Sequence, residues 1–172
     1  VLDFDLIVIA TGAIPRRLQD AEGLSRSFVL RQPDDAIKIR EAARGMNSAT
    51  IIGGGYIGLE LAATLRQMGL EISVIEVAER LLARVASPPI AKIMTDLHLK
   101  QGVSIYKGIS VKQLHHQNNA FCGITLSDDT IVQSDMLIVG IGVAPDSALA
   151  VAAGIETETI DSGAILVDDS MQ

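Results

Sequence analysis

A glycine-rich turn between two apolar segments constrains the fold of this chain more than any other feature. Residues 49–52 are largely apolar and run into GGGYIG at Gly53–Gly58, the pattern G-x-G-x-x-G, after which a helical pattern continues to about Met68. A second apolar segment, Ile72–Ile75, ends at Glu76. A strand, a tight turn, a helix and a second strand thus follow one another, which predicts a βαβ unit with parallel strands.

Each glycine of this pattern has a mechanical reason. Gly53 permits the tight turn from strand to helix, and Gly58 allows the helix and the strand to pack closely. Gly55 lets the backbone approach a pyrophosphate with no Cβ in the way. An anion placed there meets backbone N–H groups at the positive end of the helix dipole. The stretch therefore predicts a dinucleotide-binding turn in a Rossmann-like fold.

An acidic residue at the end of the second strand makes this prediction more specific. Glu76 follows Gly53 by 23 positions, close to the spacing of roughly 20 in dinucleotide-binding folds. We expect its carboxylate to accept hydrogen bonds from the adenosine ribose hydroxyls and to repel a 2′-phosphate. The sequence therefore favours NAD over NADP.

The composition argues against several other classes of partner and location. The formal charge of −7 and the pI near 4.8 disfavour nucleic acid or an anionic membrane surface. The longest apolar runs are strand-sized, whereas a membrane-spanning helix needs about 20 residues. Cys122 is the only cysteine, so no internal disulfide can form and a cytoplasmic location fits best. Cys122 lies in an apolar run and is interpreted as a core residue.

The remaining pattern predicts further strands and helices around the central unit. Leu6–Ala10 is a nearly continuous apolar run, as expected of a strand buried on both faces. Two helices that begin with proline are predicted over 33–45 and 89–100. After Lys107, turn-forming clusters separate short β-type segments, which predicts an antiparallel meander of Ile109–Leu114, Ala120–Leu126 and Thr130–Gln133.

Two predicted buried strands flank the central unit. The run ending at Thr11 breaks into Gly12, and Leu137–Val139 breaks into Gly140. This arrangement predicts that the chain leaves one domain, builds a second and returns to the first. After Gly140 we expect a short helix over 147–153 and a last strand, Ala164–Val167.

No group of side chains has the spacing of a metal site or a catalytic site. The histidines have no metal-ligand spacing with one another or with a cysteine and are interpreted as surface or packing residues, namely His98, His115 and His116. No Ser-His-Asp or paired-carboxylate arrangement follows from the spacing. We therefore predict neither a metal ligand nor a catalytic side chain.

The order of the motifs along the chain is more specific than any single motif. They are Ala10-Thr11-Gly12-Ala13, Gly53–Gly58 with Leu59-Glu60, Glu76, Arg80–Arg84 and Val139–Pro145. This series resembles the FAD-dependent pyridine nucleotide-disulfide oxidoreductases, and most of all their NADH-dependent ferredoxin and rubredoxin reductase branch. In that family an NAD domain is inserted between two parts of an FAD domain.

The resemblance implies a domain organisation and a fold class. Residues 1–29 would be a remnant of the FAD domain, 30–140 the NAD-binding domain, and 141–172 the return segment to the FAD domain. The expected fold is α/β, with a Rossmann-like parallel sheet flanked by helices and a three-stranded antiparallel β-meander, inserted between strands of a truncated FAD domain.

The resemblance also implies roles for individual residues. The phosphate turn would consist of Gly53, Gly55, Tyr56, Ile57 and Gly58, with Glu76 on the adenosine ribose. Glu60 would lie near the nicotinamide, Ile141 and Gly142 would line the nicotinamide, and Arg84 would reach the adenosine or phosphate side. Thr11 and Gly12 would belong to the flavin side.

The function implied by the resemblance is an NADH-dependent, FAD-containing oxidoreductase. Hydride would pass from NADH to FAD, and electrons would then pass to a ferredoxin- or rubredoxin-type acceptor, with a homodimer as one possible assembly. This segment alone would bind NADH without turning over. The alternatives are an NADH oxidase, a nitrite reductase or a CoA-disulfide reductase of the same superfamily, and a non-catalytic NAD-binding sensor module. A direct NAD dehydrogenase would need a catalytic acid or base that the pattern does not supply.

Overall fold

The computed structural model describes residues 3–158 and 163–171, and over these residues the chain divides into two compact units. The first, which we call the sheet unit, is the continuous segment Arg16–Gly142. The second, which we call the terminal unit, consists of the flanking segments Val1–Pro15 and Val143–Gln172. The sheet unit therefore interrupts the terminal unit once along the chain. The boundaries expected near residues 29 and 140, between FAD-domain segments and an NAD-binding domain, remain a prediction.

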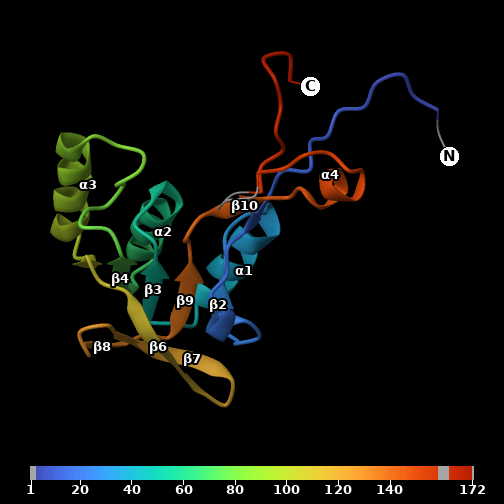
Figure 1. The fold of residues 1–172 in the computed structure, drawn as a ribbon. Helices are drawn as coiled ribbons and strands as arrows, with labels where there is room; N and C mark the ends of the chain where they lie inside the picture. The colour runs from blue at the N-terminus through green and yellow to red at the C-terminus, as the bar shows by residue number, and fades with distance from the viewer. Residues whose placement is uncertain (1–2, 159–162, 172) are drawn as a thin grey trace. The chain divides into compact units, whose positions relative to one another are not determined.

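A parallel sheet forms the centre of the sheet unit. Within the described residues it has five strands in the order β2-β9-β3-β4-β5 (Figure 1). Their bounds are β2 Ser27–Phe28, β9 Met136–Val139, β3 Ser48–Ile52, β4 Glu71–Glu76 and β5 Ser104–Lys107. Every residue of β9 is buried, because layers of structure cover both faces of the sheet.

Helices cover one face of this sheet (Figure 1). They are α1 Pro33–Ala43, α2 Tyr56–Gln67 and α3 Pro88–Lys100. A single core cluster joins them to the strands and includes Ile39 of α1, Leu65 of α2 and Ala91 of α3. Proline stands in the first turn of α1 and of α3, where its missing N–H costs no helical hydrogen bond.

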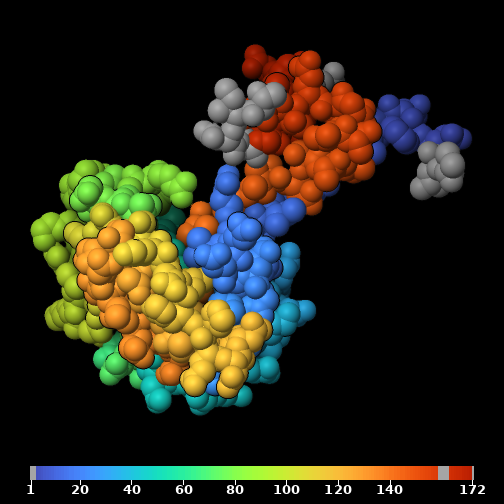
Figure 2. Space-filling view, turned by 60° about the horizontal axis from the view of Figure 1, so that its bottom comes forward, coloured from blue at the N-terminus to red at the C-terminus, as the bar shows by residue number. Residues whose placement is uncertain are grey.

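The expected meander covers the opposite face. Strands β6 Val111–Gln117, β7 Ala120–Leu126 and β8 Ile131–Gln133 pair antiparallel. A second core cluster joins this meander and the short helix η1, Gln19–Ala21, to the sheet. Figure 2 shows the meander, in yellow and orange, beside the blue segment 16–30, where Phe121 N–H donates to Ser25 O. The meander thus takes the place that helices hold on the second face of a doubly wound sheet.

The order of the strands creates a switch point between β3 and β9. From β3 the chain steps to β4 and then to β5, whereas β9 lies on the other side of β3. The meander is the crossover from β5 to β9. In open parallel sheets ligands bind at the carboxyl ends of the strands beside such a point. Gly53 follows β3 there, and Gly140 follows β9.

The terminal unit is small. Strand β1, Ala13–Pro15, pairs antiparallel with β10, Val143–Pro145, and α4, Ala148–Ala152, follows. The strand expected over 164–167 is wrong, because the structure has there only an isolated bridge between Thr157 and Ile165.

Two burial predictions are also wrong. The run expected to be a buried strand over Leu6–Ala10 is not a strand, and its Leu6 and Val8 side chains are 75% and 77% exposed. A buried strand needs hydrogen-bonded strands beside it. Among residues 3–15, only β1 pairs with another strand. Cys122 is exposed. Neighbouring strand residues point to opposite faces, and the neighbouring Phe121 is the one that is buried.

No helix among the described residues is long and apolar enough to cross a bilayer.

Candidate dinucleotide site

Two glycines of the fingerprint are required by close backbone contacts. Gly53 has a φ of +110°, and a Cβ on it would lie 2.2 Å from the carbonyl oxygen of Gly140. A Cβ on Gly58 would lie 2.1 Å from the carbonyl oxygen of Gly53. A side chain at either position would therefore collide with backbone. These contacts hold the turn after β3 against both the end of β9 and the first turn of α2.

Gly55 is different, because nothing in the described structure requires a glycine there. Its φ is −81°, which any residue can adopt. A Cβ on it would meet no atom within 4 Å. Gly55 is also the N-cap of α2 and provides no side-chain cap, so the first N–H groups of that helix remain available to a ligand. Open space beside uncapped N–H groups fits a phosphate held by this turn.

Glu76 is fixed at the tip of β4 by backbone donors. Gly54 N–H donates to its Oε2 at 2.7 Å, and Ala78 N–H donates to its Oε1 at 2.8 Å. Each carboxylate oxygen has two lone pairs, so each keeps one that could accept from a hydroxyl group. The hydrogen bond to Gly54 places this carboxylate directly beside the glycine turn.

The loop after β4 closes around the same turn. Leu82 N–H donates to Gly54 O at 2.9 Å, and Leu81 and Leu82 are buried. From this loop the exposed Arg84 reaches toward the end of β9. Its Nη2 lies 3.8 Å from the point where a Cβ on Gly142 would stand.

The other predicted residues of the sheet unit lie around this turn. Tyr56 and Ile57 begin α2 and are exposed, with the Tyr56 hydroxyl 3.5 Å from Val85 O. Glu60 is exposed one turn further along α2. Ile141 is half-buried against the meander-side core. The predicted residues of this unit thus follow β3, β4 and β9, whose carboxyl ends lie at one edge of the parallel sheet.

Thr11 and Gly12 belong to the terminal unit. The Thr11 hydroxyl donates to Asp146 O, and Asp146 N–H donates to Gly12 O at 2.9 Å. These contacts connect the segment before β1 to the segment after β10. A role for Thr11 and Gly12 on a flavin remains a prediction.

The buried histidine connects two helices. His98 is 5% exposed, with Nδ1 2.8 Å from Met94 O and Nε2 3.1 Å from Leu59 O. His98 therefore joins α3 to α2, in line with the expected packing role. Among residues 3–158 and 163–171, no group of three or more His, Cys, Asp or Glu side chains is placed to hold a metal ion.

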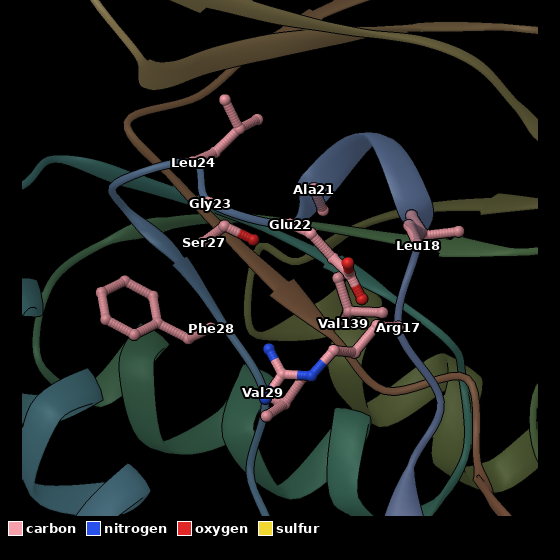
Figure 3. Close-up of a pocket in the computed structure, with 10 residues that line it drawn as sticks. All are labelled: Arg17, Leu18, Ala21, Glu22, Gly23, Leu24, Ser27, Phe28, Val29 and Val139. Carbon is pink, nitrogen blue, oxygen red and sulfur yellow. The ribbon is translucent and has the colours of Figure 1, made fainter.

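A small pocket in the sheet unit lies outside the fingerprint. Figure 3 shows Arg17 and Glu22 beside Val139 in this pocket, which is lined by Arg17, Leu18, Ala21, Glu22, Gly23, Leu24, Ser27, Phe28, Val29 and Val139. Its volume is about 60 Å³, whereas pockets that enclose small molecules measure about 300–1,000 Å³. The pocket is too small for a dinucleotide, so the open turn at Gly55 remains the candidate site.

Sequence reasoning missed three participants in the site. A side chain on Gly54 would displace a neighbour, because its Cβ would lie 2.4 Å from Cδ2 of the buried Leu81. Gly140 contributes the carbonyl that abuts Gly53. Arg80 binds the loop that carries Arg84. A third consecutive glycine and two arginines four residues apart were visible signals, but their partners are set by the folded loop.

Comparison with known proteins identifies the family. The model of a family described as pyridine nucleotide-disulphide oxidoreductase matches residues 1–172. The chain belongs to this family. Putidaredoxin reductase of Pseudomonas putida is 36% identical over 99% of this chain and 41% of the relative. Rhodocoxin reductase of Rhodococcus erythropolis is 30% identical over 99% of the chain and 39% of the relative.

Solved structures of pyridine nucleotide-disulphide oxidoreductases and similar enzymes have the same fold. The putidaredoxin reductase in a covalent complex with putidaredoxin matches with a TM-score of 0.91 and 34% identity, over 99% of this chain and 42% of that one. An NAD-dependent persulfide reductase from A. fulgidus matches with a TM-score of 0.91 and 29% identity, over 99% and 31%. The expected α/β class with its meander is thus confirmed. The chain spans about two fifths of the length of the curated relatives, for example 41% and 40%.

Proposed function

We propose that this chain is the nucleotide-binding part of an NADH-dependent flavoprotein reductase. The observation that carries the proposal is Gly55, a glycine that neither its backbone angles nor its packing requires. It lies at the uncapped start of α2, next to the switch point of a parallel sheet. A pyrophosphate that contacts Gly55 and the first N–H groups of α2 accounts for both features.

In this proposal the side chains around the turn bind the rest of the dinucleotide. Glu76, oriented by its two backbone donors, accepts from the adenosine ribose hydroxyls, and its charge opposes the 2′-phosphate of NADPH. Arg84 contacts the adenosine or phosphate side. Glu60, Ile141 and Gly142 hold the nicotinamide, and their part in the reaction is to orient it.

The acceptor of the hydride is FAD in this proposal. NADH donates two electrons as a hydride, whereas an iron–sulfur protein accepts one electron at a time. Bound FAD would supply the chemistry that connects the two. Thr11, Gly12 and the rest of the terminal unit belong to the flavin side. Support comes from relatives named terpredoxin reductase and p-cumate 2,3-dioxygenase system ferredoxin–NAD(+) reductase. A ferredoxin- or rubredoxin-type protein is therefore the proposed final acceptor.

Reduction of a disulfide or persulfide is a second candidate function within the same fold. The structure of a CoADR-RHD protein of Bacillus anthracis matches with 29% identity and a TM-score of 0.84, and the persulfide reductase matches with a TM-score of 0.91. A reductase of a disulfide or persulfide would use the same NADH site. The acceptor specificity of the intact protein distinguishes the two functions, since only the first reduces ferredoxins.

Binding of NADH and NADPH by the intact protein tests the nucleotide site. We expect wild type to prefer NADH by at least about tenfold, and Glu76→Ala to lose most of this preference, because the carboxylate both binds ribose hydroxyls and repels the 2′-phosphate. Glu79→Ala is the matched control, since Glu79 is an exposed acid three residues further along. Equal affinities of wild type for NADH and NADPH, or an unchanged preference in Glu76→Ala, would remove Glu76 from this role.

A further inference from the structure

The loop between β4 and α3 folds around the side chain of Arg80. The Arg80 Nη1 donates to Leu82 O at 3.3 Å and to Ala86 O at 2.9 Å, and Nη2 donates to Ala83 O at 2.7 Å. Three carbonyls of one short loop thus converge on a single guanidinium group. Arg80 is half-buried, so these charge-assisted hydrogen bonds are partly shielded from water.

The backbone of this loop needs such support. Leu82 has a φ of +54°, a conformation that costs a residue other than glycine free energy. Its carbonyl oxygen also accepts from Val85 N–H at 3.1 Å and Ala86 N–H at 3.0 Å. The guanidinium adds a positive charge where these carbonyl dipoles meet. The planar donor fork of arginine can hold several acceptors in a fixed geometry, which a lysine ammonium group does not do.

One of the three bonds directly fixes the backbone that precedes Arg84. The carbonyl of Ala83 and the amide N of Arg84 belong to the same planar peptide group. When Arg80 holds Ala83 O, it therefore limits the rotation of the peptide group that precedes the Cα of Arg84. The direction of the Arg84 side chain is limited with it. Leu82 N–H ties the same loop to Gly54 O, so the direction of Arg84 is set relative to the glycine turn.

We propose that Arg80 is a positioning residue for NADH, acting through Arg84 and making no contact with the nucleotide itself. This inference rests on the proposed function, in which Arg84 binds the adenosine or phosphate side of NADH. The guanidinium of Arg80 is occupied by the loop carbonyls, while the exposed Arg84 extends toward Gly142. Arg80 prepares the binding geometry before the nucleotide arrives.

A double-mutant cycle in the intact protein tests this inference. We expect Arg84→Gln to raise the dissociation constant for NADH about tenfold, because a charge-assisted contact is lost. Arg80→Met should raise it by a similar factor. In the double variant the loss should be close to that of Arg84→Gln alone, since residues that act through one another are not additive. Arg80→Lys keeps the charge without the fork and should bind NADH more weakly than wild type.

Arg66→Met is the matched control. Arg66 donates from Nε to Gln101 O at 2.9 Å and from Nη1 to Leu70 O at 3.0 Å, so it too holds backbone carbonyls. It lies at the last turn of α2, at the opposite end from the fingerprint. We expect this variant to lower the melting temperature and leave the NADH affinity within about twofold of wild type.

The possible results separate this inference from the proposed function. Multiplicative losses in the double variant would overturn the coupling between Arg80 and Arg84, and so would an unchanged NADH affinity in Arg80→Met. If Arg80→Met does not fold, Arg80→Lys decides, and an affinity equal to that of wild type would contradict the inference. Failure of wild type to bind NADH would overturn the proposed function and this inference together.

Discussion

At the scale of the residue, the glycines of the fingerprint differ in what makes them necessary. Gly53 and Gly58 are surrounded by backbone atoms of the same chain, whereas Gly55 borders open space. The fold therefore requires the first two, whereas our proposal explains the third by a bound pyrophosphate. This difference can be measured, because stability and nucleotide affinity should respond to different substitutions.

We predict that two alanine substitutions in this turn affect different quantities, one the NADH affinity and the other the stability. Gly55→Ala should weaken NADH binding by more than about tenfold, because its Cβ enters the space of the pyrophosphate, while stability falls by no more than about 1 kcal/mol. Gly53→Ala places a Cβ 2.2 Å from Gly140 O and should lower the free energy of unfolding by about 2–4 kcal/mol. Chemical denaturation and NADH titration measure the two quantities. Unchanged affinity in Gly55→Ala would contradict a phosphate at this turn.

The sequence was sufficient for some residues of the site and insufficient for others. The places of Gly53, Gly58 and Glu76 in the fold were predictable because their spacing reflects a local βαβ geometry, and their contacts with a nucleotide stay predictions. The role of Gly54 depends on Leu81, which lies 27 positions later in the sequence. The role of Arg80 depends on how a loop with a left-handed Leu82 folds back. Neither contact follows from a pattern of residue types.

At the scale of the element, predictions were best where a segment carries its own start and stop signals. Helix α1 has Pro33 and two acids in its first turn, and its Asp35 carboxylate accepts from the N–H groups of Arg31 and Gln32. The N–H of Gln32 holds the pKa of Asp35 below its ordinary value. The run Leu6–Ala10 has the composition of a buried strand but is exposed, because burial depends on neighbours that local sequence does not specify.

Asp135 connects the beginnings of β3 and β9. Its Oδ2 accepts from Asn47 N–H at 2.8 Å and from Ser48 N–H and Oγ–H at 3.0 Å. The Asn47 N–H, with help from Ser48 and the charge of Arg26, lowers the pKa of Asp135 below its ordinary value. A carboxylate with a lowered pKa in the folded state stabilises the protein above its unfolded pKa, and this contribution is lost as the pH falls through the folded value.

We therefore predict that Asp135→Asn lowers the free energy of unfolding by roughly 1–2 kcal/mol at pH 7. Wild type should lose more stability than the variant as the pH falls from about 5 to 3, because only wild type must protonate this carboxylate. Asp96→Asn is the control, since its pair with Lys92 is solvated and should be worth less than about 0.5 kcal/mol. Urea denaturation at several pH values measures these differences. Parallel stability curves for wild type and Asp135→Asn would contradict the role of Asp135.

At the scale of the whole molecule, the chain organisation is that of one unit interrupting another. The segment Arg16–Gly142 contains the sheet, the meander and the candidate dinucleotide site, and Val1–Pro15 and Val143–Gln172 form the flanking unit. The glycine-terminated apolar runs on both sides of the fingerprint suggested such an interruption, with boundaries near residues 29 and 140. That these boundaries separate an NAD-binding part from an FAD-side part remains a prediction. In our proposal the flanking unit belongs to the flavin side, which gives the NADH site its electron acceptor.

The most direct test of this account is an anaerobic titration of the intact protein with NADH and with NADPH, followed by the visible absorbance of the flavin. We predict that NADH bleaches the flavin at concentrations at least about tenfold lower than NADPH requires, because Glu76 disfavours the 2′-phosphate. An intact protein that contains no flavin, or whose flavin NADH does not reduce, would contradict the account.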